Sequence, residues 1–554
     1  MFSGQAFSES AFSEQTYAPV DSLAFQAFLA EITSPRCWLL EIDAFSLAVT
    51  GAMSGAFSNA GFSEVAFSGD AAAASGGVVT LRFSTHGYTS QAGDTPARTW
   101  YDGRLNDGIT VDRRITGKDG IGGLARVYAE ASLVNQDGEL DMWRSNYALD
   151  GRAARIYFGR ETDALSEFGM IFSGVVETFT IGTDVVPFRF SDGAARLAST
   201  IVNKTSYLGT GGLEGGADLA GKAKPKGWGH VYNMSAPLVD SANLIYQVND
   251  GPISDVPAVY DRGVALAKVA GAPAPGQYQV SAAAGTYTLG GTPAGTVTND
   301  ALLDASGSGY INTCADIVMR ILTDQVGLYS TEIEPSSFAQ LKADVPAEVG
   351  ISCVDANVAA DQVIDQLIAG VGAIGGFNRQ GAFSVGLVAA PAGAPVMTFT
   401  TENIIDIVRE PLPAAIEPIA WRTSVAYQKN YTVQNDLAAS VTAARRTFAA
   451  EAVRVSPTQD LAIQSRHLLA KEYVNDAGLY AQSADADAES LRLFNLWGSE
   501  RAMYRIKARP EALICDLGTV IDVQHPRHGL VAGKLMRVLG NTIRGTEVEL
   551  LALC

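Results

Sequence analysis

The most constraining part of this sequence is the stretch from residue 311 to residue 435, where two helical patterns lead into a run of short strands. Apolar residues recur at helical spacing over 311–327 and over 357–371, which predicts two amphipathic helices. Two short apolar runs then flank Asn378-Arg-Gln-Gly381, and the glycine predicts a hairpin turn between them. Further strands are expected over 396–401, 404–409 and 419–430.

The composition is typical of a globular chain rich in short strands. At 554 residues, the chain is expected to hold roughly two to four domains. Hydrophobic residues make up 47% and charged residues only 18%, and there are 56 glycines. Loops and short strands fit this mixture better than long charged helices do. We therefore expect an α+β, β-rich, multidomain fold.

Alternating apolar and polar residues predict strands on both sides of the central stretch. Near the N-terminus, a strand over 37–43 is expected to pair with one over 77–84. Between residues 85 and 200 the pattern is all-β and typical of a barrel or sandwich, with strands over 125–133, 154–158, 170–180 and 185–190.

The C-terminal part is predicted to contain two helices followed by strands. The first helix covers 459–473, with Leu461, Leu468 and Leu469 facing inward. The second lies within 485–509, uses Leu491, Leu493, Phe494, Leu496, Trp497 and Met503 as its apolar residues, and stops before Pro510. Strands are then expected over 513–523, 534–539 and 546–553.

Phenylalanines recur in Ala-Phe-Ser and related triplets within the first seventy residues. Their period of five matches neither a helix nor a strand. One interpretation is an extended arm whose rings anchor it to a partner surface. The other is a low-complexity tail that stays disordered. The candidate partner-binding residues are Phe2, Phe7, Phe12, Phe57, Phe62 and Phe67.

The formal net charge of −19 bears on nucleic-acid binding. Such an acidic chain is not expected to coat nucleic acid by neutralising phosphates. It could line a channel through which DNA slides without sticking, because like charges repel. The alternative is that the charge serves only solubility.

The five cysteines are scattered and form no Cys-x-x-Cys pair, which predicts reduced thiols and assembly in a cytoplasm. No basic segment followed by an apolar core begins the chain, so no signal peptide is expected. No apolar run reaches the ~18 residues that would predict a membrane span.

A search for catalytic and metal-binding patterns predicts no enzyme, no cofactor and no metal. The sequence lacks a Walker loop, a Gly-x-Ser-x-Gly elbow and a dinucleotide-binding fingerprint. Asp137, Glu139 and Asp141 invite a calcium loop, but their spacing is not that of an EF-hand. His525 and His528 share a turn with only Asp522 nearby, so a turn explains them as well as a metal does.

One local cluster of lysines lies in 221–233, in a chain otherwise poor in lysine. It could be a basic patch for an acidic subunit or for DNA, although a solvated loop entering a strand is the simpler interpretation.

Several motifs together resemble the baseplate hub, or tail-tip, proteins of long-tailed bacteriophages and gene transfer agents. In the centre these are the Phe-x-Arg-x-Gly-x-Phe hairpin of 377–383, Ile-Val-Arg-Glu-Pro at 407–411 and Val-Ala-Tyr-x-x-Asn-Tyr-Thr-Val-Gln at 425–434. Near the end, Val-x-His-Pro-Arg-x-Gly-Leu at 523–530 continues into Gly-Lys-x-x-Arg-Val-Leu-Gly at 533–540. Further matching segments are 84–88, 99–104, 133–141, 233–240, 246–252 and 259–264. The resemblance covers roughly residues 75–554.

This resemblance implies a tail-hub architecture with two related β-barrel-like domains, an inserted β domain and a small helix/hairpin domain. It implies a first β-barrel domain at 75–204, an inserted β domain at 205–310, a helix-hairpin and β domain at 311–435, and helices with a final β domain at 436–554. The N-terminal arm with its hairpin insertion, at 1–74, lies outside the resemblance.

The resemblance also implies a structural virion protein at the tip of a non-contractile, siphophage-type tail. There, hub proteins form homotrimeric rings that join the tail tube to tip proteins and pass DNA during ejection. The implied partners are further copies of the chain, the distal tail protein or tube, the tape measure protein, and tip or receptor-binding fibre proteins. DNA would pass without specific binding, and assembly would take place in the host cytoplasm.

Two other functions remain open from the sequence. The chain could be a tail-tip enzyme that degrades the host cell wall, or a tail protein that binds the host receptor. A peptidoglycan turbidity assay would distinguish the first, and binding of the isolated protein to whole cells would distinguish the second.

Overall fold

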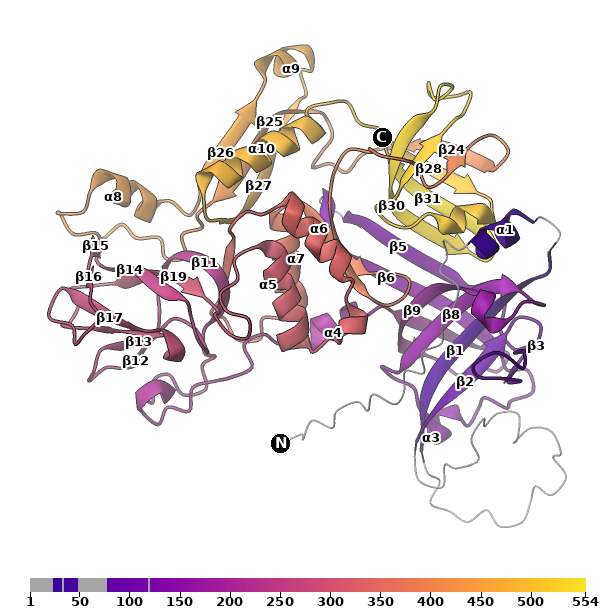
Figure 1. The fold of residues 1–554 in the computed structure, drawn as a ribbon, viewed down its shortest axis with the longest axis horizontal. Helices are drawn as coiled ribbons and strands as arrows, with labels where there is room; N and C mark the ends of the chain where they lie inside the picture. The colour runs from indigo at the N-terminus through magenta and orange to yellow at the C-terminus, as the bar shows by residue number, and fades with distance from the viewer. Residues whose placement is uncertain (1–22, 32–33, 48–76, 118–119) are drawn as a thin grey trace, which may run out of the picture.

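The computed structural model describes residues 23–31, 34–47, 77–117 and 120–554 (Figure 1). The six phenylalanines predicted to bind a partner lie outside these residues, as does the hairpin insertion expected between the first two strands. Within the predicted arm, the structure describes a short helix, α1 (Leu23–Ala30), which the sequence analysis missed.

The largest sheet has sixteen strands and joins the two ends of the chain. Its main path runs β2-β1-β8-β9-β10-β6-β5-β30-β31-β28-β24, so that β5 pairs antiparallel with β30. The strands of the path are β1 (Arg36–Ser46), β2 (Val78–Ser84), β5 (Thr110–Gly117), β6 (Gly120–Val134), β8 (Ala153–Arg160), β9 (Gly169–Phe179), β10 (Val185–Ser191), β24 (Ile404–Glu410), β28 (Met503–Ala508), β30 (Lys534–Arg544) and β31 (Glu547–Leu553). Off the path lie β7 (Tyr147–Ala148), β21 (Ala373–Phe377), β22 (Phe383–Leu387), β23 (Thr398–Phe399) and β29 (Val520–Val523).

Period-two patterning explains the N-terminal strands. In β10, Val186, Phe188 and Phe190 are buried while the residues between them are exposed, as expected for a strand with one face on the core. Strand β1 is covered on both faces, and its pairing with β2 confirms the predicted strand pair. The side chains facing inward from these strands join those of the C-terminal strands in one hydrophobic core.

The predicted barrel is not closed. Residues 102–106 bridge the edge strand β2 to β6 only through single hydrogen bonds, including Leu105 N to Ser84 O and Asn106 N to Ser132 O. The physical reason is that the second edge of β6 is hydrogen-bonded to β5, and β5 is paired in turn with β30. The sheet therefore extends into the C-terminal strands instead of curling back on itself.

The segment between β10 and the central helices, joined by strand β20 from between two of those helices, forms two five-stranded sheets around a core of their own. These sheets project from one side of the molecule (Figure 1). The first has the order β15-β14-β19-β11-β20 and the second β12-β13-β18-β17-β16. Their strands are β11 (Lys226–Met234), β12 (Leu238–Asp240), β13 (Ile245–Gln247), β14 (Asp255–Asp261), β15 (Val264–Ala265), β16 (Ala267–Lys268), β17 (Gln277–Ser281), β18 (Thr286–Leu289), β19 (Val297–Leu303) and β20 (Gly350–Cys353).

A group of helices fills the middle of the molecule, and its amphipathic faces build a second large core (Figure 1). These helices are α4 (Ala194–Ser199), α5 (Cys314–Arg320), which continues as a π-helical turn over Ile321–Val326, α6 (Pro335–Asp344) and α7 (Ala360–Gly370). Thr313 caps α5 by accepting a hydrogen bond from the Asp316 backbone N–H. Helices α5 and α7 and the β21–β22 hairpin confirm the predictions for the central stretch.

A smaller lobe comprises a three-stranded sheet of order β26-β25-β27, with α10 against it. Its elements are β25 (Ala420–Tyr427), α8 (Ala443–Ala450), β26 (Arg454–Gln459), α9 (Leu461–Arg466), β27 (Lys471–Tyr480) and α10 (Ser483–Trp497). Thr423 and Ser490 are hydrogen-bonded where α10 crosses β25. Figure 1 shows α9 at the outer end of this lobe.

Two sequence-based predictions in this region are wrong. Residues 459–473 are not one helix, because α9 ends at Arg466 and residues from Lys471 onward pair with β25 as a strand. Leu468 and Leu469 consequently occupy a turn and are 89% and 80% exposed instead of facing inward. Strand pairing across the sheet overrides the helical spacing of the leucines.

Smaller differences affect the last helix and the residues after it. Helix α10 ends at Trp497, so Met503 belongs to β28, and Leu491 is 52% exposed. The predicted strand pair over 513–523 is instead a 3₁₀ turn, Pro510–Ile514, followed by β29. The remaining short elements are β3 (Tyr88–Thr89), β4 (Trp100–Tyr101), α3 (Trp143–Asn146) and 3₁₀ turns at Leu165–Glu167, Gly212–Glu214, Ala282–Ala284 and Ser330–Glu332.

Candidate functional site

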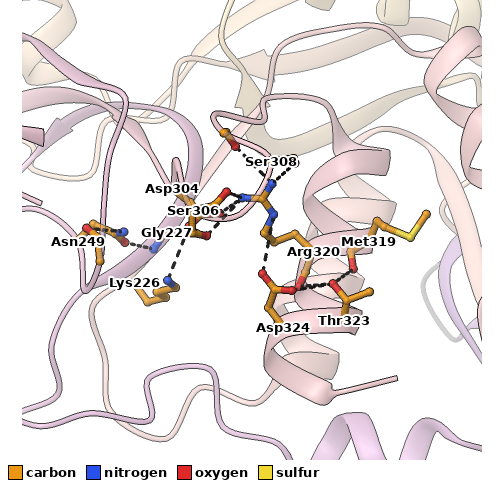
Figure 2. Close-up of polar contacts among 12 residues, drawn as sticks. Lys226, Gly227, Asn249, Asp304, Ser306, Ser308, Met319, Arg320, Thr323 and Asp324 are labelled. Carbon is orange, nitrogen blue, oxygen red and sulfur yellow. Dashed lines mark hydrogen bonds and ion pairs between the residues drawn. The ribbon is translucent and has the colours of Figure 1, made fainter. Parts of the chain in front are cut away.

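A buried ion pair joins the inserted sheets to the central helices (Figure 2). Asp304 follows β19 and is 1% exposed, and Arg320 at the end of α5 is 9% exposed. The Arg320 guanidinium donates to Asp304 Oδ2 at 2.9 Å, to the Ser306 carbonyl at 2.6 Å and to Ser308 Oγ at 2.8 Å. The cluster therefore fixes the orientation of the inserted sheets relative to the central helices.

Arg379, the arginine of the Phe-x-Arg-x-Gly-x-Phe motif, links the β21–β22 hairpin to the C-terminal part of the chain. The Arg379 side chain is fully buried. Its guanidinium donates to the backbone carbonyls of Leu513 and Cys515, the second at 2.8 Å, and its Nε lies 3.7 Å from Asp516 Oδ2. Arg113 of β5 is also paired with Asp516. Burial opposes ionisation of Asp516, but the two guanidiniums outweigh it and hold the pKa of this carboxyl below its ordinary value.

A third polar cluster lies where the inserted sheets, the start of α5 and the end of β27 meet. Glu348 accepts hydrogen bonds from the Tyr310 hydroxyl at 3.0 Å and Asn312 Nδ2 at 3.4 Å, and its Oε2 lies 3.4 Å from His230 Nδ1. Chiefly through His230, this environment lowers the pKa of Glu348 to about 2. Tyr232 stacks on the His230 ring and donates to the Ala481 carbonyl. The cluster connects parts of the fold to one another, since every polar group in it contacts another part of the same chain.

A cavity of about 800 Å³ opens between the hairpin, β6, α6 and residues 516–519. Arg113, Asp516 and Arg537 line it, but each already has partners: Arg113 pairs with Asp516, and Arg537 donates to backbone carbonyls, including that of Ala389. The rest of the lining is mainly apolar, with Glu334 and Asp344 of the α6 region at its rim. Such a lining suits an apolar ligand better than acid–base chemistry.

The acidic loop considered for calcium has its carboxylates engaged by protein groups. Arg104 forms ion pairs with Asp137 and Glu139, while Asn135 Nδ2 donates to Asp141 Oδ1 at 2.8 Å. Hydrogen bonding to Arg104 lowers the pKa of Asp137 to about 2. The arginine thus supplies the positive charge that a cation would otherwise bring.

The side chains of His525 and His528 are also engaged in local contacts. His525 Nδ1 accepts the Arg527 backbone N–H, and the His528 ring packs edge-on against Tyr504. Asp522 Oδ2 accepts from Gln524. Across the part of the chain that the structure describes, no three His, Cys, Asp or Glu side chains lie together as a metal site would require.

The lysine cluster is mostly neutralised within the chain. Lys224 pairs with Glu214 at 2.6 Å, and Lys226 donates to the Asp250 carbonyl and lies 3.9 Å from Asp304. Only Lys222 of the three is exposed. These contacts favour the interpretation as a loop entering a strand, because little free positive charge is left for DNA.

All five cysteines are buried and unpaired, as the sequence predicted for reduced thiols. Burial raises the pKa of Cys314, Cys353 and Cys515 to about 12, so these thiols act as small apolar groups. No helix among the described residues is both long enough and apolar enough to cross a bilayer.

Matches to known proteins come from solved structures alone. No family model and no curated protein matches the chain. Among solved structures it is similar to a tail protein from Neisseria meningitidis MC58, at TM-score 0.40 and 10% identity over 81% of this chain and 92% of that one. It is also similar to the 43 kDa tail protein of prophage MuSo2 from Shewanella oneidensis, at TM-score 0.37 and 10% identity over 83% and 96%.

A chain of the native gene transfer agent virion matches at TM-score 0.38 and 15% identity, over 60% of this chain and 84% of that one. These structures are of phage tail proteins and of a gene transfer agent, the same kinds of protein that the sequence motifs resemble.

Proposed function

We propose that this chain is a structural tail protein, and specifically the central baseplate hub at the tip of a non-contractile phage tail. In this role three copies form a ring that joins the tail tube to the tip proteins and lets DNA pass during ejection. Its neighbours would be the distal tail protein or tube, the tape measure protein, and tip or receptor-binding fibres.

The observation that carries this proposal is the pairing of β5 with β30. It places the N-terminal and C-terminal β units side by side in one continuous sheet, as expected of a subunit that contributes two β units to a ring. Arg113 and Arg379 reinforce the same junction through Asp516. Meanwhile the inserted sheets project to one side, where they would not obstruct a ring (Figure 1).

The charge balance supports passage of DNA without binding. The formal net charge is −19, and two of the lysines in the one local cluster are committed to acidic or carbonyl partners. A lumen formed by such a chain would repel phosphates instead of retaining them. We also propose that the chain is not an enzyme, since Arg113, Asp516 and Arg537 in its cavity already have partners within the chain.

The test is the mass of the purified full-length chain by light scattering, together with negative-stain images of the same fraction. A trimer that forms a ring with a central hole is expected. Gold labelling of an affinity-tagged chain in intact particles should mark the tail tip. A monomer that clears a peptidoglycan suspension would overturn the proposal in favour of a cell-wall-degrading enzyme, and labelling away from the tip would also contradict it.

A further inference from the structure

The turn between α9 and β27 presents two adjacent leucines to solvent. Leu468 and Leu469 are 89% and 80% exposed, and the turn is closed by a hydrogen bond from the Ala470 N–H to the His467 carbonyl. Single exposed leucines are common on protein surfaces. Two neighbouring leucines on a tight projecting turn are a different case, because such a compact apolar knob fits a pocket on a partner.

The same chain contains a cavity with the matching character. The cavity beside the β21–β22 hairpin has a volume of about 800 Å³, within the range of protein pockets that accept apolar groups. Its apolar lining comes from three parts of the fold that are far apart in sequence. The main contributors are Ile115, Ile121, Ile374, Val385, Leu387 and Leu539.

The charges around the two surfaces are complementary. Glu334 and Asp344 lie at the cavity rim, and no ion pair within the described part of the chain neutralises either of them. Arg466 immediately precedes the leucine turn, is exposed, and likewise forms no ion pair among the described residues. An arginine arriving beside the turn would therefore meet two carboxylates that accept hydrogen bonds from Ser336, Asn378 and Gln340 but have no cationic partner among the described residues, which favours this orientation over the reverse.

The turn and the cavity of a single copy cannot meet. Figure 1 shows α9 at the outer end of its lobe, well separated from α6 and β6, which border the cavity. We propose that the Leu468–Leu469 turn of one copy inserts into the hairpin cavity of the next copy. Because the contact joins two different surfaces, its repetition generates a closed ring or an open filament. The inference rests on the proposed function for its choice of the ring.

The first test compares assembly of the full-length wild-type chain with that of a Leu468→Asp/Leu469→Asp variant by light scattering. Both side chains are exposed, so the charges should not disturb folding of a single copy. The variant is expected to fall to the mass of one chain, 58.2 kDa, while the wild type assembles. Val531→Asp is the matched control, because Val531 is also an apolar turn residue and is 73% exposed. A double variant that assembles as the wild type does would overturn the inference.

A covalent test does not depend on loss of assembly. Leu469→Cys is combined with Gln340→Cys, an exposed position of α6 at the cavity rim. All five native cysteines are buried, so mild oxidation should join only the introduced pair. A ladder of linked chains that ends at the ring size is expected from the double variant, and at most dimers from each single variant. Equal products from the single and double variants would contradict the contact.

The outcomes separate this contact from the hub role. If the chain is at the tail tip and the aspartate pair leaves assembly intact, the contact is wrong and the hub role stands. If gold labelling finds the chain elsewhere while the leucines still control assembly, the contact stands and the hub role fails. A wild-type chain that stays monomeric at every concentration, together with a double-cysteine variant that yields no ladder, overturns the contact.

Discussion

Arg320 of α5 and Asp304, which directly follows β19 of the inserted sheets, form an ion pair of 2.9 Å with both side chains almost completely buried. Neither residue belongs to a motif recognised in the sequence. Their pairing is nevertheless a buried polar link between the insertion and the helices, and Ser306 and Ser308 accept further hydrogen bonds from the guanidinium.

Replacing Arg320 with alanine should destabilise this link strongly. Removing one partner of a buried ion pair typically costs about 3–5 kcal/mol, and here the buried Asp304 would keep only Lys226, whose Nζ lies 3.9 Å from Asp304 Oδ1. Hydrogen exchange measured by mass spectrometry should show faster exchange in β19 and α5, with β1 and β8 little affected. Lys268→Ala is the matched control, because its pair with Asp255 is more than a third exposed on the Lys268 side and should be worth at most about 1 kcal/mol. Equal effects of the two substitutions would show that burial does not determine how much the Arg320–Asp304 pair contributes to stability.

Replacing Arg379 with methionine should loosen the junction between the hairpin and the C-terminal strands. The substitution keeps an apolar stem but removes the side-chain donor to the Leu513 carbonyl, whereas the Cys515 carbonyl still accepts from Asn541 Nδ2 at 2.8 Å. One unsatisfied buried group costs about 1–3 kcal/mol, so a loss of about 1–3 kcal/mol in unfolding free energy is expected. Gln380→Ala in the same turn is exposed and should change stability by less than about 0.5 kcal/mol. Urea denaturation measures both.

The Glu348 cluster predicts a defined acid sensitivity. Because the folded-state pKa of this carboxyl is lowered from 4.5 to about 2, its ionised form stabilises the fold above pH 4.5. That contribution should be lost as the pH falls from about 4.5 through 2. In thermal melts across this range, Glu348→Gln should lose less stability than the wild type, while being less stable at pH 7. Parallel curves for the two proteins would rule out this origin of the acid sensitivity.

The acidic loop near Arg104 should be indifferent to calcium. Its carboxylates are held by Arg104 and Asn135, so a cation would have to displace existing partners. The melting temperature is therefore expected to be the same in calcium chloride and in a chelator. A calcium-dependent rise would revive the metal interpretation, and its loss in Asp137→Asn would assign it to this loop.

Local sequence patterns predicted the helices, strands and turns whose formation depends mainly on the residues within them. The central helices and hairpin follow from apolar spacing, from the Thr313 cap and from Gly381, whose φ of 81° suits a turn glycine. Strands β8, β9 and β10 follow from alternation, and the burial of all five cysteines agrees with their scattered positions. The motif that contains Arg379 could be recognised in the sequence, but its bonding to Leu513 and Cys515 could not.

Only the tertiary structure decided the features that require contact between segments far apart in the sequence. The sequence alone determined a β-rich chain with a helix-hairpin centre, because apolar periodicity and turn residues act over a few positions. Separately, its motifs resemble those of phage tail proteins. It could not determine that β5 joins β30, that Arg320 reaches Asp304, or that Leu468 and Leu469 lie outside, since β27 became a strand only by pairing with β25. Long-range strand pairing and burial set these outcomes, and a local pattern carries no record of which distant segment will be the partner.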